Sequence, residues 1–317
     1  MKKIIVEHLA PGALGETAIT IGNFDGVHLG HLKVIQHLKE RAKEKQLPTV
    51  AVTFEPHPVK ILNPTKGLRM IFPISTRTRL IALEQVDYLA IINFTKELAA
   101  MSAEQFTREY IVEKFKAKLV VVGYDFNFGH YGDGDAKMMS GLGAKLGFEV
   151  DQVEPYEVEG RVVSSSRIRR LIRSGEMEMV AKLMGRPFHL TGHVITGKNR
   201  GGRLLGFPTA NLSRQQEIVP AFGVYVTIVK LGDGRVIAGA ANVGYNPTFE
   251  TEGLKIEAHL LDFSDNIVGQ PIEIYFLSRI RDEMRFDTVD HLVAQMQRDV
   301  SYVKKFLSGK DLAGAIH

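Results

Sequence analysis

GNFDGVHLGH, residues 22–31, is the stretch from which the fold of this chain can be argued. It follows a short apolar run at 18–21 and precedes an amphipathic pattern from Leu32 to about Lys45, so it predicts a turn from a strand into a helix. Glycines let backbone N–H groups approach a ligand closely, and a helix N-terminus supplies unpaired donors and partial positive charge. The stretch therefore indicates a phosphate-binding turn that carries His28 and His31.

Length and composition are those of a globular protein of about two domains. The chain has 317 residues, of which 44% are hydrophobic and 24% charged. No apolar run approaches the roughly 20 residues that span a bilayer, and the apolar run near the N-terminus is too short for a signal peptide. The chain has 0 cysteines, which fits a reducing compartment. We therefore expect a cytoplasmic protein with no membrane partner.

The front half alternates β-rich runs with helical patterns. Strands are expected at 18–22, 49–54, 88–94, 118–123 and 148–153, and helices near 31–46, 76–86, 102–116 and 136–146. Such alternation predicts an α/β, Rossmann-like parallel sheet with helices on both faces. Ligands bind at the carboxyl ends of such strands. The decapeptide, TFEPHP and VGYDFNFGHYGDG follow the first, second and fourth of these strands, so we expect all three at one rim.

The back half has a different pattern, in which one strand follows another with Gly, Asn and Asp turns. Strands are expected at 189–196, 224–230, 236–243, 255–261 and 272–277, and a final helix at about 288–307. This predicts an antiparallel β-barrel with a C-terminal helix. The expected domains are therefore 1–184 and 185–317.

Two segments of the front half suit a triphosphate. His28 and His31 can stabilise charge that develops on phosphorus, and 164–169 adds hydroxyls and guanidinium donors after the last strand. The two histidines could instead only cap a helix, and RIRRLIR could be a solvated helix face. A zinc site of His28, His31 and Asp25 is a further alternative, which a glycine-rich turn without cysteine disfavours.

The back half carries a basic glycine loop at 197–203 and the segment LGFPTAN at 205–211. The loop could wrap phosphates or be a hairpin turn. Thr209 and Asn211 alternate along an extended segment, so their oxygens point to one side, where they could hold Mg²⁺ beside substrate phosphates. Glu257 alternates with Ile256 and Ala258, a pattern typical of a solvent-facing strand position.

The front motifs together resemble the HxGH nucleotidyltransferase superfamily, and GNFDGVHLGH, TFEPHP and GYDFNFG resemble the FMN adenylyltransferase module of bacterial bifunctional riboflavin kinase/FAD synthetases. The resemblance implies that His28, His31 and Arg169 hold and activate ATP. It also implies nucleotide or FMN binding at Gly22, Asn23, Phe24, Asp25, Gly26, His57, Asp125, Asn127, Ser165 and Ser166. The family usually has threonine where this chain has Ser166, and serine keeps the hydroxyl.

The back half resembles the riboflavin kinase family in four ordered motifs, at 192–211, 223–225 (GVY), 242–249 (NVGYNPTF) and 256–263 (IEAHLLDF). By that resemblance Thr209 and Asn211 are Mg²⁺ and ATP ligands, and Glu257 is the catalytic base. Further binding positions implied are Gly197, Arg203, Gly206, Phe207, Pro208 and Arg281. Arg281, with Glu283 and Arg285, could equally form surface ion pairs.

The resulting expectation is a bifunctional enzyme that converts riboflavin to FMN and FMN to FAD, with ATP and Mg²⁺ at each site. Its partners are small-molecule substrates. A nucleic-acid-binding protein is the rival from another class, but the basic run at 161–173 is short and no aromatic-rich strand accompanies it, so no nucleic acid partner is expected. An alternative within the same enzyme class is that the front domain is an adenylyltransferase for another phosphate-bearing substrate. The sequence predicts no oligomeric state.

Overall fold

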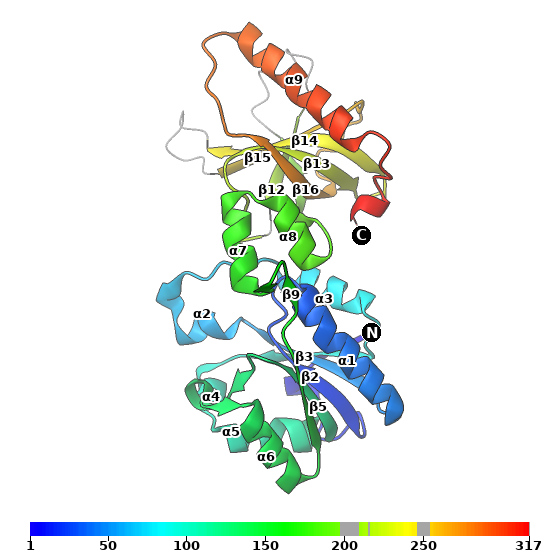
Figure 1. Ribbon diagram of the computed structural model, residues 1–317, viewed down its shortest axis with the longest axis vertical. Helices are drawn as coiled ribbons and strands as arrows, with labels where there is room; N and C mark the ends of the chain where they lie inside the picture. The colour runs from blue at the N-terminus through cyan, green and yellow to red at the C-terminus, as the bar shows by residue number, and fades with distance from the viewer. Residues whose placement is uncertain (197–208, 215, 246–253, 317) are drawn as a thin grey trace. The chain divides into compact units, whose positions relative to one another are not determined.

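The computed structural model describes residues 1–196, 209–214, 216–245 and 254–316. The chain divides into two compact units, Met1–Ser165 and Ser166–His317, which are described in turn (Figure 1). None of the helices in the described ranges is long and apolar enough to cross a membrane.

The first unit alternates strands and helices, as the front half of the sequence predicts. Its strands are β1 (Lys2–Ile5), β2 (Thr17–Ile21), β3 (Thr49–Glu55), β4 (Tyr88–Asn93), β5 (Ala117–Gly123), β8 (Glu149–Val153) and the short pairs β6 (Asn127–Phe128) with β7 (Gly134–Asp135) and β9 (Glu157–Val158) with β10 (Arg161–Val162). Its helices are α1 (Leu29–Glu44), α2 (Pro58–Leu62), α3 (Ile74–Leu83), α4 (Lys96–Ala99), α5 (Ala103–Phe106) and α6 (Ala136–Leu146).

Six strands form one parallel sheet in the order β1-β4-β3-β2-β5-β8. β2 lies between β3 and β5, so the segments that follow these three strands leave the sheet at neighbouring carboxyl ends. The expected convergence of the decapeptide, TFEPHP and VGYDFNFGHYGDG on one rim is confirmed. The chain runs outward from β2 in both directions, which is where ligands bind in open α/β sheets.

The sheet is buried on both faces because alternate residues of its central strands join different cores. Ala18 and Leu119 pack with Leu38 of α1, whereas Ile19 and Val120 belong to the cluster that includes Met139 of α6. Figure 1 shows α1 on one side of the sheet and α5 and α6 on the other. Strands covered on both faces read as continuous apolar runs, which explains why the sequence signal was clear.

Two elements differ from the sequence-based expectation. β1 was not expected, because a four-residue edge strand that pairs only with β4 carries too little pattern to recognise. The helix expected at 102–116 is α5 followed by a π-helical stretch, Thr107–Lys114. Phe106 and Ile111, five residues apart and both buried, share the same core, and this spacing matches the π-helical hydrogen-bond step.

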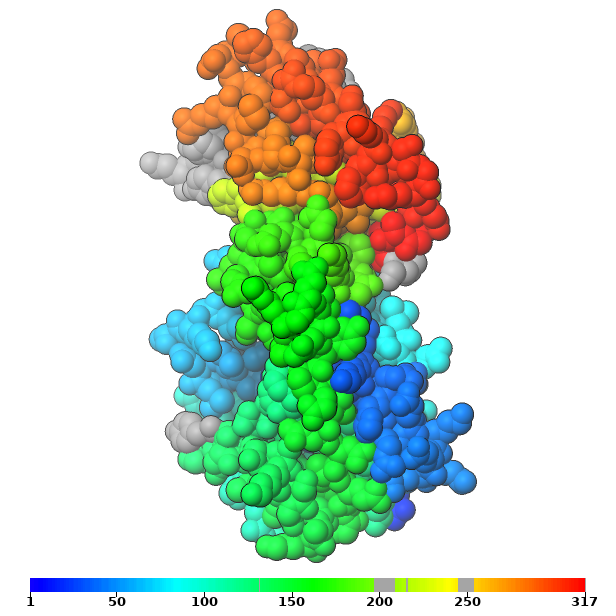
Figure 2. Space-filling model, viewed as in Figure 1, coloured from blue at the N-terminus to red at the C-terminus, as the bar shows by residue number. Residues whose placement is uncertain are grey.

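The second unit is a closed barrel in the order β11-β12-β15-β14-β13-β16. Its elements are α7 (Ser165–Ser174, whose first residue ends the first unit), α8 (Met177–Met184), β11 (Phe188–Ile195), β12 (Thr209–Arg214), β13 (Gly223–Leu231), β14 (Val236–Tyr245), β15 (Leu254–Leu260), β16 (Pro271–Arg281) and α9 (Val289–Leu307). The extended segment expected around Thr209 and Asn211 is the sixth strand, and the ring closes through it. Val303 and Leu307 of α9 pack against Val226 and Ile228 of β13. The outer surface of α9 is orange to red in Figure 2.

The domain boundary expected after residue 184 stays a prediction. The compact division falls earlier, after Ser165, because α8 packs on β11 and β16 of the barrel. The buried residues Met177 and Val180 of α8 face that contact, and the Ala221 amide donates to the Ile172 carbonyl of α7. The strand-rich pattern at 185 thus marks the start of the barrel strands, and two helices precede them.

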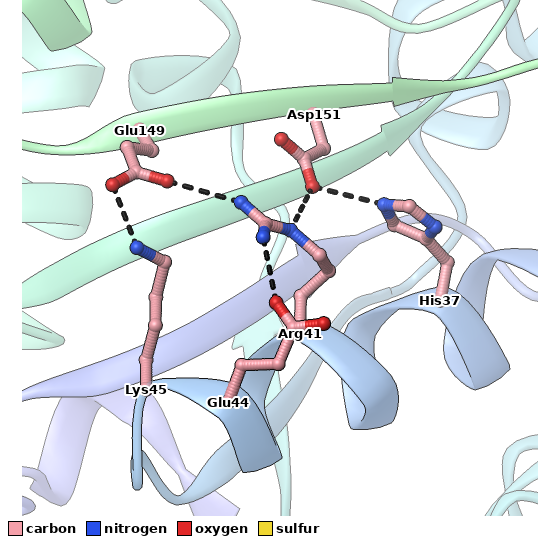
Figure 3. A network of polar contacts seen from close by, with 6 residues as sticks. All are labelled: His37, Arg41, Glu44, Lys45, Glu149 and Asp151. Atoms are coloured by element: carbon pink, nitrogen blue, oxygen red, sulfur yellow. Dashed lines mark hydrogen bonds and ion pairs between the residues drawn. The ribbon is translucent and has the colours of Figure 1, made fainter.

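An ionic network fixes α1 against the edge strand β8 (Figure 3). Asp151 accepts from His37 Nε2 at 2.9 Å and from Arg41 Nε at 2.8 Å, while Glu149 pairs with Arg41 at 3.1 Å and with Lys45 at 2.6 Å. Partial burial alone raises the pKa of Asp151, but the hydrogen bonds from His37 and Arg41 outweigh it, so the pKa lies below its ordinary value.

We expect Asp151→Asn to lower the free energy of unfolding at pH 7 by at most about 1 kcal/mol, because the network is partly solvated. Since the folded-state pKa is lowered, this stabilisation is present above the unfolded-state pKa of about 3.9 and is lost as the pH falls through the lowered value. Urea unfolding of both proteins between pH 2 and 7 measures it. A difference that stays constant down to pH 2 would contradict the assignment.

Candidate active sites

The two histidines of the decapeptide cap α1 reciprocally. His28 is the N-cap residue, and its Nδ1 accepts from the His31 amide at 3.3 Å, while His31 Nδ1 accepts from the His28 amide at 3.3 Å. The rings are stacked, with centroids 3.6 Å apart and planes at 15°. This is a capping box in which imidazoles replace the usual hydroxyl and carboxamide groups.

The caps fix which ring nitrogens carry protons. A nitrogen that accepts a backbone N–H bond has no proton of its own, so each neutral ring is protonated on Nε2. His28 Nε2 lies 3.4 Å from Ser165 Oγ. Capping and phosphate binding, which the sequence posed as alternatives, would use different nitrogens of the same rings and are therefore compatible. Phosphate binding by the two histidines stays a prediction, and a helix N-terminus is a place suited to phosphate oxygens.

Packing favours glycine at two points of this turn. A Cβ on Gly30 would lie 3.2 Å from the His28 ring, so the stacked imidazole would have to shift by a small amount. Gly26 has φ +88°, a left-handed conformation, and its Cβ would meet Ile71 at 3.0 Å. The spacing of the glycines thus follows from the geometry of the turn as much as from ligand approach.

Asp25 supports the turn from inside. It is buried, and its carboxylate accepts from the Ile71 amide at 3.0 and 3.2 Å and from the Phe72 amide at 3.3 Å. The same residue's carbonyl accepts from Ser165 Oγ at 2.8 Å, which brings the serine-rich segment to the decapeptide as expected. The zinc alternative would need Asp25 oxygens that these backbone amides already occupy, and no cluster of three metal-ligating side chains occurs among the described residues.

The other front residues lie on the same rim in different roles. His57 is buried and caps α2, with Nδ1 accepting from the Val59 amide at 3.1 Å. Asp125 and Asn127 are exposed after β5, and Asn127 donates to the Asp125 carbonyl at 2.9 Å. Phe128 is buried in the core, while Phe54 and Phe126 are partly buried against it. Gly22, Asn23 and Phe24 form the start of the turn, directly after β2.

Ser166 and Arg169 lie on the first turns of α7. Ser166 is the first residue of the second unit, and the binding roles of both residues stay predictions.

In the second unit, barrel register brings the kinase candidates together. Asn211 of β12 lies opposite Glu257 of β15, and Thr209 lies opposite His259. Residues directly opposite in an antiparallel pair share a face, with Cβ atoms about 5 Å apart. Asn211 is 7% exposed, and its Nδ2 has no hydrogen-bond partner among the described residues. Glu257 therefore stands beside Asn211 and Thr209, although it lies 46 and 48 positions after them in the sequence.

Several expected residues lie outside the described ranges, namely Gly197, Arg203, Gly206, Phe207 and Pro208. Arg281 is described, and the structure gives it the ion-pair role that the sequence left open. Its guanidinium bonds both carboxylate oxygens of Asp299 on α9, with Nη2 at 2.7 Å, and donates to the Asp282 carbonyl. A binding role for Arg281 stays a prediction.

One buried residue at the front rim carries no motif and was missed. Arg77 of α3 donates to the Asn23 carbonyl at 2.9 Å. The available signal was its helical spacing, since Arg77 lies three and four residues before Leu80 and Ile81 on the buried face of α3.

Two family models match the chain: FAD synthetase over residues 11–167 and riboflavin kinase over residues 184–307. The bifunctional riboflavin kinase/FMN adenylyltransferase of Bacillus subtilis is 35% identical over 307 residues, which cover 95% of this chain and 96% of the relative. That of Haemophilus influenzae is 33% identical over 301 residues, covering 95% and 97%. A solved structure named a macrolide-efflux protein, from Streptococcus pneumoniae, is 32% identical with a TM-score of 0.87, covering 96% and 99%.

We expect His28→Ala to lower the free energy of unfolding by about 1 kcal/mol more than His28→Asn, because asparagine is a good N-cap and alanine is not. Urea unfolding, with hydrogen exchange of the His31 amide as the local readout, measures the difference. Equal destabilisation by the two variants would mean that the imidazole does not cap α1.

Proposed function

The chain belongs to the family of bifunctional riboflavin kinases/FMN adenylyltransferases, and we propose that two separate sets of its residues carry the two reactions. The first unit contains the FAD synthetase region, which converts FMN to FAD, and the second contains the riboflavin kinase region, which converts riboflavin to FMN. ATP, riboflavin and FMN are the substrates. The assignment of residues to each step is the proposal.

For adenylyl transfer, we propose that His28 and His31 bind phosphate oxygens of ATP through their Nε2–H groups. The phosphate of FMN attacks the α-phosphorus, a new P–O bond forms, and the bond to pyrophosphate breaks. This phosphate is largely dianionic near pH 7, so no residue has to remove a proton from it. Catalysis then consists of positioning and charge stabilisation. The observation that supports this most is the pair of caps, which directs both Nε2–H groups away from the α1 backbone.

Ser165 belongs to the first unit, where its hydroxyl donates to the Asp25 carbonyl at the turn. Ser166 and Arg169 stay predicted hydroxyl and guanidinium donors for phosphate. Asp25 contributes indirectly, through the backbone amides that it accepts from. His57, Asp125 and Asn127 mark the two flanking segments where nucleotide and flavin would lie.

For phosphorylation, we propose Glu257 as the general base. The ribityl hydroxyl of riboflavin is neutral and a poor nucleophile, so a carboxylate that takes its proton is useful as oxygen attacks the γ-phosphorus and ADP leaves. The register places Glu257 beside Asn211 on one face, which supports a shared site. Gly197, Arg203, Gly206, Phe207 and Pro208 stay predicted contacts of the same site.

Thr209 and Asn211 would hold Mg²⁺ at the kinase site. The residues present fit that ion, because a hydroxyl and an amide oxygen on one strand face are hard ligands, and substrate phosphates add negative charge. The Asn211 Nδ2 has no hydrogen-bond partner among the residues that the structure describes, so this amide could also donate to a substrate oxygen. When bound, Mg²⁺ neutralises charge on the transferring phosphoryl group. We also propose a cytoplasmic location, consistent with 0 cysteines.

We expect Glu257→Gln to reduce FMN formation at least about 100-fold because the base is lost. We expect His31→Ala to reduce FMN-to-FAD conversion by about 100-fold or more because a phosphate donor is lost. Chromatographic separation of flavins after incubation with ATP and Mg²⁺ measures both.

Each variant serves as the other's control, because the two family models match separate regions of one chain. Glu257→Gln should still convert FMN to FAD, and His31→Ala should still make FMN. If one substitution in a folded protein silenced both activities, the two-site proposal would be wrong.

We expect removal of divalent cations to abolish FMN formation and added Mg²⁺ to restore it. Asn211→Ala should raise the Mg²⁺ concentration for half-maximal kinase rate about tenfold or more, because one oxygen ligand is lost. Rates measured against Mg²⁺ concentration test this, with FMN-to-FAD conversion as the internal reference. An unchanged kinase Mg²⁺ dependence would exclude Asn211 as a ligand.

A further inference from the structure

Arg77 is an arginine in an unusual environment. It is 1% exposed and ranks among the largest fully buried side chains, on a helix face whose neighbours Leu80 and Ile81 are also buried. An arginine stays charged in proteins, so burial at this depth requires partners that satisfy the guanidinium. The partners of the guanidinium therefore indicate the role of Arg77.

The partners come from two segments of the rim where the adenylyl-transfer residues lie. Arg77 Nη1 donates to the Asn23 carbonyl at 2.9 Å and lies 3.4 Å from Thr53 Oγ1, and Nη2 forms an ion pair with Glu55. Thr53 Oγ1 itself donates to the Asn23 carbonyl at 3.3 Å. One buried cation thus joins the start of the 22–31 turn to the end of β3.

The Asn23 carbonyl lies in the turn that follows β2 directly. Phe24, the next residue, has φ 47°, a left-handed conformation that a non-glycine residue adopts only when its surroundings hold it there. Two donors on the Asn23 carbonyl supply such a restraint immediately before it. Without Arg77, that buried carbonyl would keep only the longer bond from Thr53.

The same residue carries an unsatisfied group. Asn23 Oδ1 is buried and has no hydrogen-bond partner among the described residues. An oxygen acceptor cannot bond a phosphate oxygen, so its ligand partner has to carry a donor, such as a sugar hydroxyl or an exocyclic amine. Holding the Asn23 backbone therefore also restricts the position of this acceptor, which suits a donor group on the nucleoside part of a nucleotide.

We propose that Arg77 is a positioning residue for adenylyl transfer. It holds the Asn23 carbonyl and the carboxyl end of β3 together, so that the turn presents Asn23 Oδ1 and the two imidazoles to one nucleotide. This rests on the proposed function of the 22–31 turn as the ATP site. Arg77 itself does not touch substrate, and its effect passes through Asn23.

The test uses the full chain and steady-state kinetics of FMN-to-FAD conversion, with riboflavin phosphorylation measured in the same preparations. Arg77→Met keeps length and removes every donor, and it should raise the KM for ATP at least tenfold. Arg77→Lys keeps the charge but cannot serve all three partners, and should restore part of the loss. Glu55→Gln should raise the KM about threefold, because one partner of the guanidinium is weakened.

Matched controls come from an exposed ion pair in the same unit. Arg108→Met and Glu104→Gln make the same chemical changes at a pair whose side chains are both more than half exposed, and should leave both activities within twofold. Thermal unfolding of each variant separates the alternatives. A merely structural Arg77 would lower the melting temperature and leave the KM for ATP of the folded enzyme unchanged, which would overturn the proposal.

Two further outcomes are decisive. If Arg77→Met does not fold, Glu55→Gln decides, since the Glu55 side chain is 42% exposed and its loss does not threaten the core; an unchanged KM there overturns the proposal. His31→Ala, run in parallel, separates the two levels of argument. If it leaves FAD formation intact, the ATP site itself is misassigned and the role of Arg77 falls with it. If it abolishes FAD formation while Arg77→Met has no effect, only the positioning role fails.

Discussion

The first turn of α1 is the constraint on which the front unit depends. A helix N-terminus leaves backbone N–H groups unsatisfied, and in this chain His28 and His31 satisfy two of them through Nδ1, so that Nε2, the proposed phosphate donor, lies on the other side of each ring. Position 30 has little room for a side chain, because a Cβ there would lie 3.2 Å from the His28 ring. Packing therefore favours the glycine of the HxGH sequence.

Buried polar groups hold this turn in place from behind. Asp25 accepts from the amides of Ile71 and Phe72, and Arg77 donates to the Asn23 carbonyl, so a carboxylate of the turn and a guanidinium of α3 tie two residues of the turn to other segments. Buried charges are costly unless they are paired, and Arg77 is paired only through its two Nη atoms, since its Nε has no hydrogen-bond partner among the described residues. Such groups specify one arrangement rather than simply adding stability. A preorganised turn loses less conformational entropy when a nucleotide binds.

The sequence was sufficient to predict those elements whose hydrophobic pattern or glycine motif lies within one short segment. Strands such as β2 and β5 are mostly apolar, and the glycine-rich turn follows β2 directly, so the parallel sheet and its rim could be predicted. β1 escaped notice because it is short and lies at the edge, and the π-helical winding of 107–114 has no residue type that signals it. Arg77 escaped because its partners are a carbonyl and two side chains from distant segments, which no spacing along the chain reveals.

In the barrel, the sequence predicted the candidate residues but not their proximity in space. Thr209 and Asn211 were recognised by motif, and Glu257 by another motif far along the chain, but their proximity is a matter of strand register. β12 pairs with β15 so that Asn211 faces Glu257; a shift of one residue would put the carboxylate opposite Ala210 or Leu212, on the other face of the wall. That register is fixed by closure of the six strands, with Ala258 and Ile256 turned to the buried side. The apolar interior of the barrel therefore decides which polar residues meet on its outer face. The proposed kinase reaction thus depends on apolar side chains that take no part in the reaction themselves.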